Sequence, residues 1–276
     1  MEHEEKLVLN LKLYEEYWKK INKREVRNFK INLHKPASLF VFDCLTSTNT
    51  KVWQLIDNQV RCPIGAIALQ QTSGRGQWGH RWISHPGGLY LSVGLDLDLE
   101  VVNYPHLVIA TAWGIATVLR RYKLPVTIKW SNDLIIERRK LGGIKIETRN
   151  IDHKLTKAVV GVGINWRNPV PDPGINLNSY YQSKGIQGIN SLSELAAITT
   201  YGILLGYEYY LSVGIKKLLE KYLEILMSIG QKVRFHGCAG EVIGVTTEGE
   251  LKVKLRSPGA STEIMLSPGQ ISLGYE

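Results

Sequence analysis

The stretch that most constrains the fold is the segment Gln71–Trp82, which reads Gln-Thr-Ser-Gly-Arg-Gly-Gln-Trp-Gly-His-Arg-Trp. The apolar run 65–71 before it reads as a strand, and so does the run 89–97 after it. Pro86 and the two glycines that follow it leave no room for a helix between these strands. The segment is therefore predicted to be a long loop that joins two strands.

The residue types in this loop favour a phosphate attached to a flat group. Glycine lets the backbone come close to a ligand, and arginine offers a rigid set of donors that suits phosphate. Gly74, Gly76 and Gly79 also have the G-x-G-x-x-G spacing of dinucleotide-binding sites, with Asp96 about twenty residues further on. That motif requires a helix to begin at the glycines, so its absence here argues against a nicotinamide or flavin site.

Length and composition indicate an intracellular globular protein. A chain of 276 residues with 44% hydrophobic residues can form one large domain, or one large and one small domain. The three cysteines are scattered without metal-type spacing, which indicates reduced thiols. The charged N-terminus is unlike a signal peptide, and no run approaches the ~18 apolar residues of a membrane span. We therefore expect a cytoplasmic protein with no membrane contact.

The net charge of +9 lies mainly in the middle of the chain. Residues 1–30 hold eight basic and six acidic residues, and residues 231–276 hold five of each, so the remainder carries +7. This surplus is compatible with nucleic-acid binding, or with an anionic small substrate and an acidic protein partner. The basic residues are dispersed and form no stripe, which favours the second interpretation.

Apolar periodicity predicts an α+β chain in three parts. Residues 1–37 form a helical extension, with a helix over 3–28 whose apolar face holds Leu7, Leu11, Tyr14, Trp18 and Ile21. Residues 38–229 form the main domain, and residues 230–276 form a small bent β barrel. The main domain is expected to hold strands at 38–43, 65–71, 89–97, 126–130, 134–136, 141–147 and 159–166, helices following 47–50, at 104–121 and at 191–227 with a break near Gly214, a charged turn at 137–140 and a loop at 169–190. The barrel strands are expected at 232–235, 241–246, 250–255, 263–266 and 271–273.

Two features of the main domain allow both a structural and a functional interpretation. The segment Ser47-Thr48-Asn49-Thr50 stands between a strand and a helix, where its side chains could cap the helix or bind a small polar ligand. Gly161 and Gly163 alternate on one strand and leave one of its faces bare. Either a planar ligand or a closely packed helix would fill that face.

Four segments resemble motifs of the biotin protein ligases, in the same order and with similar spacing. They are the loop Gly74–Trp82, Lys129-Trp130-Ser131-Asn132-Asp133, Lys140-Leu141-Gly142-Gly143-Ile144 with Glu147, and Gly161-Val162-Gly163-Ile164-Asn165. Ser47-Thr48-Asn49 stands where the family has a biotin-contacting Ser-Thr-Asn. The resemblance covers residues 38–276. It implies a mixed, mostly antiparallel sheet packed with helices in a biotin/ATP-binding catalytic domain, followed by an SH3-like β domain.

The resemblance implies an ATP-dependent ligase that forms biotinyl-5′-AMP with the help of Mg²⁺. The biotinyl group would pass to a lysine of a biotin carboxyl carrier protein, with biotin as substrate and no tightly bound prosthetic group. Such chemistry requires positioning and charge neutralisation and needs no covalent nucleophile on the protein. We expect no nucleic acid as a partner and no metal ion held by protein ligands. The chain would be a monomer or a homodimer.

The resemblance also implies roles for individual residues. Lys140 and Arg75 would be catalytic, because they would neutralise the biotin carboxylate and the α-phosphate. Biotin would contact Ser47, Thr48, Asn49, Gln71, Arg75, Gly76, Gln77, Lys140 and Gly143. ATP or the adenylate would contact Gly74, Arg75, Gly76, Gly79, Trp82, Lys129, Asn132, Asp133 and Asn165. Trp82 would pack on the adenylate, and Asp133 would help to place metal or pyrophosphate.

This sequence departs from the family pattern at three positions. Gln77 stands where arginine is common, so the loop lacks one positive charge. Ser131 replaces a proline, and Lys145 replaces an aliphatic residue on its strand. Some family members also carry an N-terminal DNA-binding domain, but here the first strand begins near residue 38, so we expect no repressor role.

Two other functions remain open from sequence. One is a lipoate or octanoate ligase or transferase with the same general architecture, which the four motifs disfavour. The other is a non-catalytic carrier- or nucleic-acid-binding protein, for which Lys140 and the intact Gly74-Arg75-Gly76 would be unnecessary.

Overall fold

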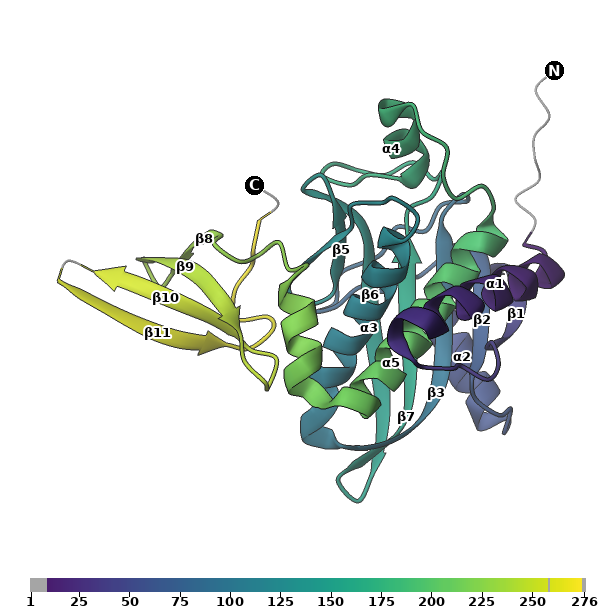
Figure 1. Cartoon of the computed structure of the whole chain (residues 1–276), viewed down its shortest axis with the longest axis horizontal. Helices are drawn as coiled ribbons and strands as arrows, with labels where there is room; N and C mark the ends of the chain where they lie inside the picture. Colours follow the sequence, from purple (N-terminus) through teal and green to yellow (C-terminus); the bar gives the residue numbers. More distant parts are fainter. Residues whose placement is uncertain (1–8, 258, 275–276) are drawn as a thin grey trace.

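A seven-stranded mixed sheet forms the centre of the fold (Figure 1). The computed structural model describes residues 9–257 and 259–274. The strands are β1 (Ser38–Leu45), β2 (Ile64–Gln71), β3 (Leu89–Glu100), β4 (Thr127–Lys129), β5 (Asp133–Ile136), β6 (Arg139–Ile151) and β7 (Lys154–Ile164). They lie in the order β1-β2-β3-β7-β6-β5-β4. Only β1 and β2 pair in parallel, and the other neighbours are antiparallel.

Helices cover both faces of this sheet. They are α1 (Leu11–Phe29), α2 (Thr48–Asp57), α3 (Tyr104–Arg120), α4 (Leu177–Lys184) and α5 (Leu192–Leu223), with a short 3-10 turn at Val101–Asn103. Alternate residues of a strand point to opposite faces. Accordingly, Ile67 and Val160 belong to the large core under α3 and α5, whereas Ala66 and Val159 pack with Val52 of α2. The side chains of the candidate functional site lie on the α2 face.

Helix α3 is almost entirely buried, as its apolar composition predicts. The segment Val101–Arg120 is long and apolar enough to cross a membrane by length and composition, but most of it is buried inside the fold. A Cβ on Gly114 would lie 2.8 Å from the backbone of Gly206 on α5. Only glycine permits such close packing of two helix backbones.

A second sheet follows α5 and projects to one side of the main sheet (Figure 1). Its antiparallel strands are β8 (Lys232–Phe235), β9 (Cys238–Val245), β10 (Leu251–Ser257) and β11 (Ala260–Leu266), in the order β11-β10-β9-β8. This arrangement is consistent with the predicted SH3-like barrel. The prediction of a strand at 271–273 is wrong. This segment is irregular, and Leu273 is buried in the main core instead of pairing with a strand.

Three other expectations differ from the structure. The loop expected at 169–190 contains α4, which Asn176 caps by accepting a hydrogen bond from the Ser179 amide. The expected turn at 137–140 is shorter, because only Glu137 and Arg138 have positive φ and Lys140 lies on β6. On α1, Tyr14, Trp18 and Ile21 are buried, but Leu11 is 41% exposed. Leu7 and the predicted start of that helix lie outside the described residues.

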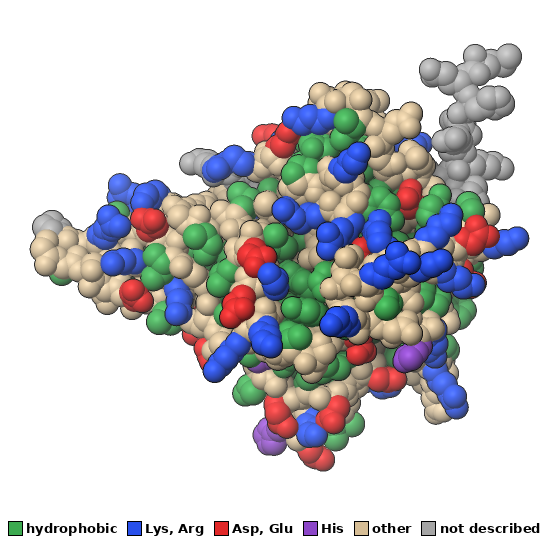
Figure 2. Space-filling view, viewed as in Figure 1, with side chains coloured by type: hydrophobic (Ala, Val, Ile, Leu, Met, Phe, Trp, Pro, Cys, Tyr) green, Lys and Arg blue, Asp and Glu red, His purple; other side chains and the backbone are tan. Residues whose placement is uncertain are grey.

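The fold class is confirmed as α+β with a mixed, mostly antiparallel sheet. Helix α5 is interrupted at Gly214, where φ is 75°, close to the predicted break. The division into residues 1–37, 38–229 and 230–276 stays a prediction. On the face seen in Figure 2, basic side chains gather most densely over α1, with acidic and apolar side chains among them.

Candidate functional site

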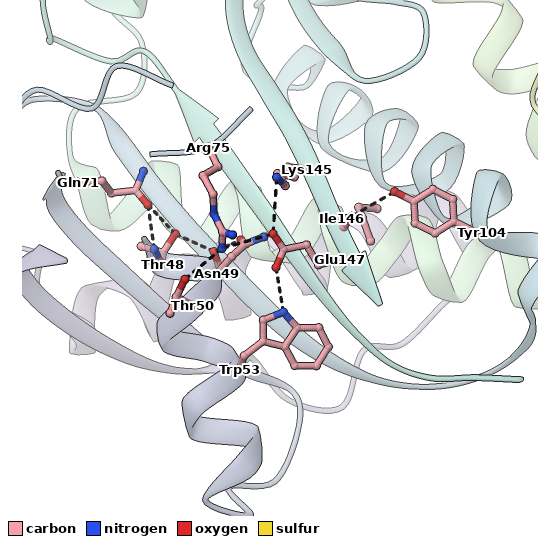
Figure 3. A network of polar contacts seen from close by, with 11 residues as sticks. Thr48, Asn49, Thr50, Trp53, Gln71, Arg75, Tyr104, Lys145, Ile146 and Glu147 are labelled. Carbon is pink, nitrogen blue, oxygen red and sulfur yellow. Dashed lines mark hydrogen bonds and ion pairs between the residues drawn. The ribbon is translucent and has the colours of Figure 1, made fainter. Parts of the chain in front are cut away.

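Most of the predicted site residues line one cavity on the α2 face of the main sheet, and Gly74, Gly79, Lys129 and Asn165 are the exceptions. It lies where the start of α2, the end of β2, the loop and strands β5 to β7 come together. Its lining residues are Ser47, Thr48, Asn49, Gln71, Arg75, Gly76, Gln77, Trp82, Asn132, Asp133, Lys140, Gly143, Ile144, Lys145, Gly161, Val162 and Gly163. The motifs are thus far apart in sequence but form a single site, which Figure 3 shows in part.

A buried hydrogen-bond chain holds the start of α2 in place (Figure 3). The Gln71 side-chain carbonyl accepts from the Thr48 amide at 2.8 Å and from its hydroxyl at 3.2 Å. Ser92 on β3 lies 2.7 Å from the Thr48 hydroxyl and 2.6 Å from Asn49 Oδ1. Ser47 stands at the N-cap position, but its side chain makes no capping bond. The capping interpretation is therefore wrong for Ser47, which lines the cavity.

The two glycines of β7 make room for side chains from elsewhere in the chain. A Cβ on Gly161 would collide with the Asn49 side chain, and a Cβ on Gly163 would collide with the Trp82 indole. The bare face is thus filled by one residue of α2 and one of the loop. The Trp82 Nε1 is buried and has no hydrogen-bond partner among the described residues. The remaining cavity is small, about 60 Å³.

Lys140 reaches this cavity because β6 is irregular. Leu134 pairs with Gly142 while Ile135 pairs with Lys140, so β6 holds one extra residue at this point. Such a bulge re-aims side chains. Lys140 and Gly143 consequently both line the cavity, although residues three apart on a regular strand point to opposite faces.

Backbone and side-chain contacts fix Lys140 firmly. Its amide donates to the Pro173 carbonyl at 3.0 Å, and its carbonyl accepts from the Ile175 amide at 2.9 Å. Its ammonium lies 2.7 Å from an Asp133 oxygen and 5.5 Å from the centre of the Trp82 ring. The charge is therefore held at the cavity by a carboxylate and an aromatic face.

Lys129 adds a second cation beside Asp133. Lys129 is largely buried, with 8% of the residue exposed. Burial lowers the Lys129 pKa, the Asp133 charge raises it, and the Lys140 charge lowers it. Two lysines thus act on one carboxylate, which leaves this cluster with one positive charge in surplus.

The two asparagines that are predicted to contact ATP or the adenylate have partners within the protein. Asn132 donates to the Ile144 carbonyl at 2.6 Å. Asn165 is buried, donates to the Lys140 carbonyl at 3.4 Å and accepts from Asn168 at 3.0 Å. Asn132 lines the main cavity, whereas Asn165 lines a neighbouring one that shares Trp82 and Lys140 with it.

Arg75 is held on the opposite side of the cavity, against β6 (Figure 3). Its guanidinium donates to the Thr50 hydroxyl at 3.0 Å and lies 3.5 Å from Glu147 Oε1. Lys145 lies 3.7 Å from the same oxygen, and the Trp53 indole donates to Glu147 Oε2 at 2.9 Å. This cluster also has two cations and one carboxylate.

The loop glycines differ in what they do. A Cβ on Gly74 would lie 2.6 Å from the Ser84 hydroxyl, so Gly74 is needed for the packing of the loop itself. Gly76 lines the cavity, and its amide donates to the His80 carbonyl at 2.7 Å. Gly79 has a φ of 77° and lies on the exposed turn, away from the residues that line the cavity.

A larger cavity of about 510 Å³ adjoins the first and is shared with the C-terminal segment. Gln77, Trp82, Lys129 and Lys140 line it on one side, and residues 268–273 line it on the other. The Trp78 ring lies 3.2 Å from the position of a Cβ on Gly269. The loop therefore contacts the part of the chain that follows the second sheet.

Three residues of the site were not predicted to contact a ligand or to shape the site. Ser92 and Trp53 carry no motif, and only the folded structure brings them to the cavity network. Glu147 ends one of the four motifs, but its contact with Arg75 depends on the path of the loop, whereas its other cationic partner, Lys145, lies on the same strand. Alternation along β6 does place Gly143, Lys145 and Glu147 on one face, which is a signal present in the sequence.

The residues that the structure describes form no dedicated metal site of their own. Within residues 9–257 and 259–274, no group of three or more His, Cys, Asp or Glu side chains could hold a metal ion. Mg²⁺ commonly binds through one or two carboxylates and substrate phosphates. Asp133, beside Lys140 at the cavity, is a carboxylate of that kind.

Comparison with known proteins shows similarity to one family. Residues 41–165, less than half of the chain, match the profile of the Biotin/lipoate A/B protein ligase family. The chain is 26% identical over 225 residues to the bifunctional ligase/repressor BirA of Bacillus subtilis, covering 77% of this chain and 68% of the relative. It is 27% identical to BirA of Escherichia coli over 213 residues, covering 76% and 66%.

Solved structures share the fold. The biotin protein ligase of Aquifex aeolicus in complex with biotin and ATP superposes with a TM-score of 0.65 at 22% identity, covering 83% of this chain and 95% of that one. The enzyme of Leishmania major with biotin gives 0.58 at 20% identity, covering 83% and 98%. At these identities the likeness shows the fold alone. A biotin protein ligase-like protein of unknown function from Silicibacter also matches, with a TM-score of 0.61 at 14% identity.

Proposed function

We propose that this chain activates biotin with ATP and transfers the biotinyl group to a lysine of a biotin carboxyl carrier protein. In the first step an oxygen of the biotin carboxylate attacks the α-phosphorus of ATP, and pyrophosphate leaves. In the second step an uncharged carrier lysine attacks the acyl carbon of biotinyl-5′-AMP, AMP leaves, and the amine loses its proton to solvent. The names of similar proteins support the proposal: the Bacillus subtilis relative is a ligase/repressor, and the Aquifex aeolicus structure is a biotin protein ligase in complex with biotin and ATP.

The observation that carries the proposal is the charge arrangement around the cavity. Lys129 and Lys140 share Asp133 on one side, and Arg75 and Lys145 share Glu147 on the other. Each cluster holds two cations and one carboxylate, so the cavity carries an excess of positive charge on both sides. Such a site suits a ligand with two anionic groups, as a carboxylate and an α-phosphate are.

Lys140 is the residue best placed to join the two reacting groups. A lysine ammonium is a compact point charge, and here its backbone is anchored on both sides by residues 173 and 175. Lowering the repulsion between a carboxylate and a phosphate while holding them together is catalysis by positioning and charge. Arg75 would neutralise the phosphate from the loop side.

The neutral polar residues would hold biotin. Thr48 and Gln71 line the cavity and are fixed by their mutual hydrogen bonds, and the Gln71 amide nitrogen also donates to Ser84 at 2.9 Å. The Trp82 indole N–H has no partner among the described residues and lines the same cavity. A ligand acceptor would satisfy it. Because the loop also covers the cavity, its closure would keep water from the reactive anhydride.

Mg²⁺ would arrive with the phosphates of ATP, where it neutralises part of their charge. Asp133 fits the role of its protein ligand because it already lies at the cavity. Lys140 would then pass from Asp133 to the ligand.

The test is incubation with ATP, Mg²⁺ and, in separate samples, biotin, lipoate or octanoate. Mass spectrometry then looks for the acyl adenylate, and a carrier domain is added to look for its acylated form. We expect adenylate with biotin and transfer to the carrier. Adenylate with lipoate or octanoate alone would favour the alternative lipoate-type activity, and no adenylate with any acid would contradict an enzymatic role.

A further inference from the structure

Glu147 is the point where the loop, α2 and β6 meet (Figure 3). Its Oε1 atom lies 3.5 Å from the Arg75 guanidinium and 3.7 Å from the Lys145 ammonium. Its Oε2 atom accepts the Trp53 indole N–H at 2.9 Å. The Glu147 side chain is only 23% exposed, and these three partners contact its carboxylate.

Arg75 has two partners that it must leave if it is to meet a ligand. The guanidinium is bound by Thr50 of α2 and by Glu147 of β6. Removing one partner from a half-buried ion pair leaves the other charge uncompensated, and this raises the free energy of the state in which the pair is broken. In a cluster of only Arg75 and Glu147, the carboxylate would retain the arginine.

Lys145 changes this balance. It follows Gly143 on the same face of β6, lines the same cavity, and is 26% exposed. When Arg75 leaves, Glu147 keeps one cation and one indole N–H donor. The carboxylate therefore stays neutralised, and the arginine is released at lower cost.

We propose that Lys145 is a positioning residue that acts as the resident counter-ion of Glu147 and so frees Arg75 for the anionic ligand. The inference rests on the proposed function, because it takes the adenylate phosphate as the anion that Arg75 meets. It gives Lys145 and Glu147 a joint role: Glu147 holds the loop arginine in place before the ligand binds, and Lys145 keeps this hold weak enough to be exchanged.

The experiment is a double-mutant cycle with Lys145→Met, Glu147→Gln and the combined variant. Methionine keeps most of the length of the lysine stem, and glutamine keeps an acceptor for Trp53. The readouts are the KM for ATP and kcat in biotin-dependent ATP–pyrophosphate exchange. Lys154→Met is the matched control, because Lys154 pairs with Asp98 on the exposed neighbouring strand, away from the cavity.

We expect Lys145→Met to raise the KM for ATP about fivefold, the effect of strengthening one partly exposed ion pair, with a smaller change in kcat. Adding Glu147→Gln should return the KM to within about twofold of that of Glu147→Gln alone, because the carboxylate that retained Arg75 is gone. Lys154→Met should behave like the wild type. If the combined variant is as impaired as Lys145→Met, Lys145 contacts the ligand directly and the proposal is overturned; an unchanged KM in Lys145→Met also overturns it.

A second measurement separates this inference from the proposed function. Calorimetric titration of ATP into the same four variants and the wild type, without biotin, reports binding alone. If the wild type has no exchange activity, the proposed function fails, and the pattern of ATP affinities still decides the role of Lys145. Restoration of affinity in the combined variant supports it, and its absence contradicts it.

Discussion

The ammonium of Lys140 lies 2.7 Å from the carboxylate of Asp133, and the Lys140 backbone lies at a bulge of β6. The lysine that the proposed reaction needs is thus already charged, oriented and paired before a substrate binds. Pre-organisation of this kind removes the cost of collecting a flexible cation during the reaction. It also means that Asp133 must exchange its partner when the phosphates arrive.

Replacement of Lys140 by alanine should abolish most adenylate formation. Losing one positioned charge at a reacting centre typically costs about 10²–10³-fold in rate, and Asp133 would then add an uncompensated negative charge beside the phosphate. The measurement is biotin-dependent ATP–pyrophosphate exchange, with Lys154→Ala as the surface control. Near-normal turnover of the Lys140→Ala protein would refute the assignment.

Replacement of Gly163 by alanine should disturb the loop through Trp82. The added Cβ would collide with the indole, and overpacking of this kind typically costs about 1–3 kcal/mol of stability. Urea denaturation measures the loss. Gly244→Ala is the matched control, because a Cβ there meets only the Lys252 side chain at 3.6 Å.

Trp82→Ala provides the complementary test. If the indole is the obstacle, Gly163→Ala should destabilise the Trp82→Ala protein much less than it destabilises the wild type. Equal losses in both backgrounds would mean that the strand itself, and not the loop residue, rejects the side chain.

The sequence motifs indicated which residues meet at the cavity, but they did not indicate the contacts around it. Lys140, Asp133, Gln71 and Thr48 lie at one cavity because strand ends and a helix start carry short motifs whose order is visible in the chain. The sharing of Glu147 by Arg75 and Lys145 depends on where a long loop folds back. Such long-range contacts leave no periodic signal in the sequence.

The missed elements have local causes. The segment 169–190 was interpreted as a loop from its Pro, Gly and Asn content, yet Asn176 and Gly185 are the cap and stop of the short helix α4. Residues 271–273 have strand-like composition but pack against the main core. Composition alone cannot tell an apolar segment that pairs with a strand from one that covers a core.

Ligand binding should protect the loop from trypsin. Arg75 and Arg81 are exposed, and the loop between them is held by few bonds, among them the Gly76 amide to the His80 carbonyl. Adenylate would add contacts to Arg75 and Trp82, so cleavage at both arginines should slow in its presence. Cleavage rates are read by mass spectrometry, and equal rates with and without biotin plus ATP would count against closure.

Trp78→Ala should have the opposite effect on the same assay. The Trp78 ring is in contact with Gly269 and is the loop residue that reaches the C-terminal segment. Its loss should speed cleavage at Arg75 and Arg81 without ligand, because the loop loses an apolar anchor. A cleavage rate equal to that of the wild type would show that this contact does not restrain the loop.

His106 connects α3 to α5 and to the hairpin of the second sheet. His106 of α3 lies 2.9 Å from the Tyr210 hydroxyl of α5 and 2.7 Å from the Thr247 carbonyl in the second sheet's hairpin. A carbonyl only accepts, so Nε2 carries the proton and the neutral ring accepts from Tyr210 through Nδ1. Burial lowers the pKa of His106 from its ordinary 6.5, although the Thr247 carbonyl and Glu248 oppose this shift.

A lowered pKa in the folded state means that the unfolded chain binds more protons in the window just below pH 6.5. The stability that His106 contributes is therefore complete above that pH and is lost as the pH falls through the folded pKa. His106→Gln keeps a donor for Thr247 and an acceptor for Tyr210 but does not titrate. Between about pH 7.5 and pH 5, the free energy of unfolding should consequently fall more steeply for the wild type than for His106→Gln. Chemical denaturation at several pH values measures both slopes, and parallel slopes would mean that His106 is not a pH-dependent link between α3 and the second sheet.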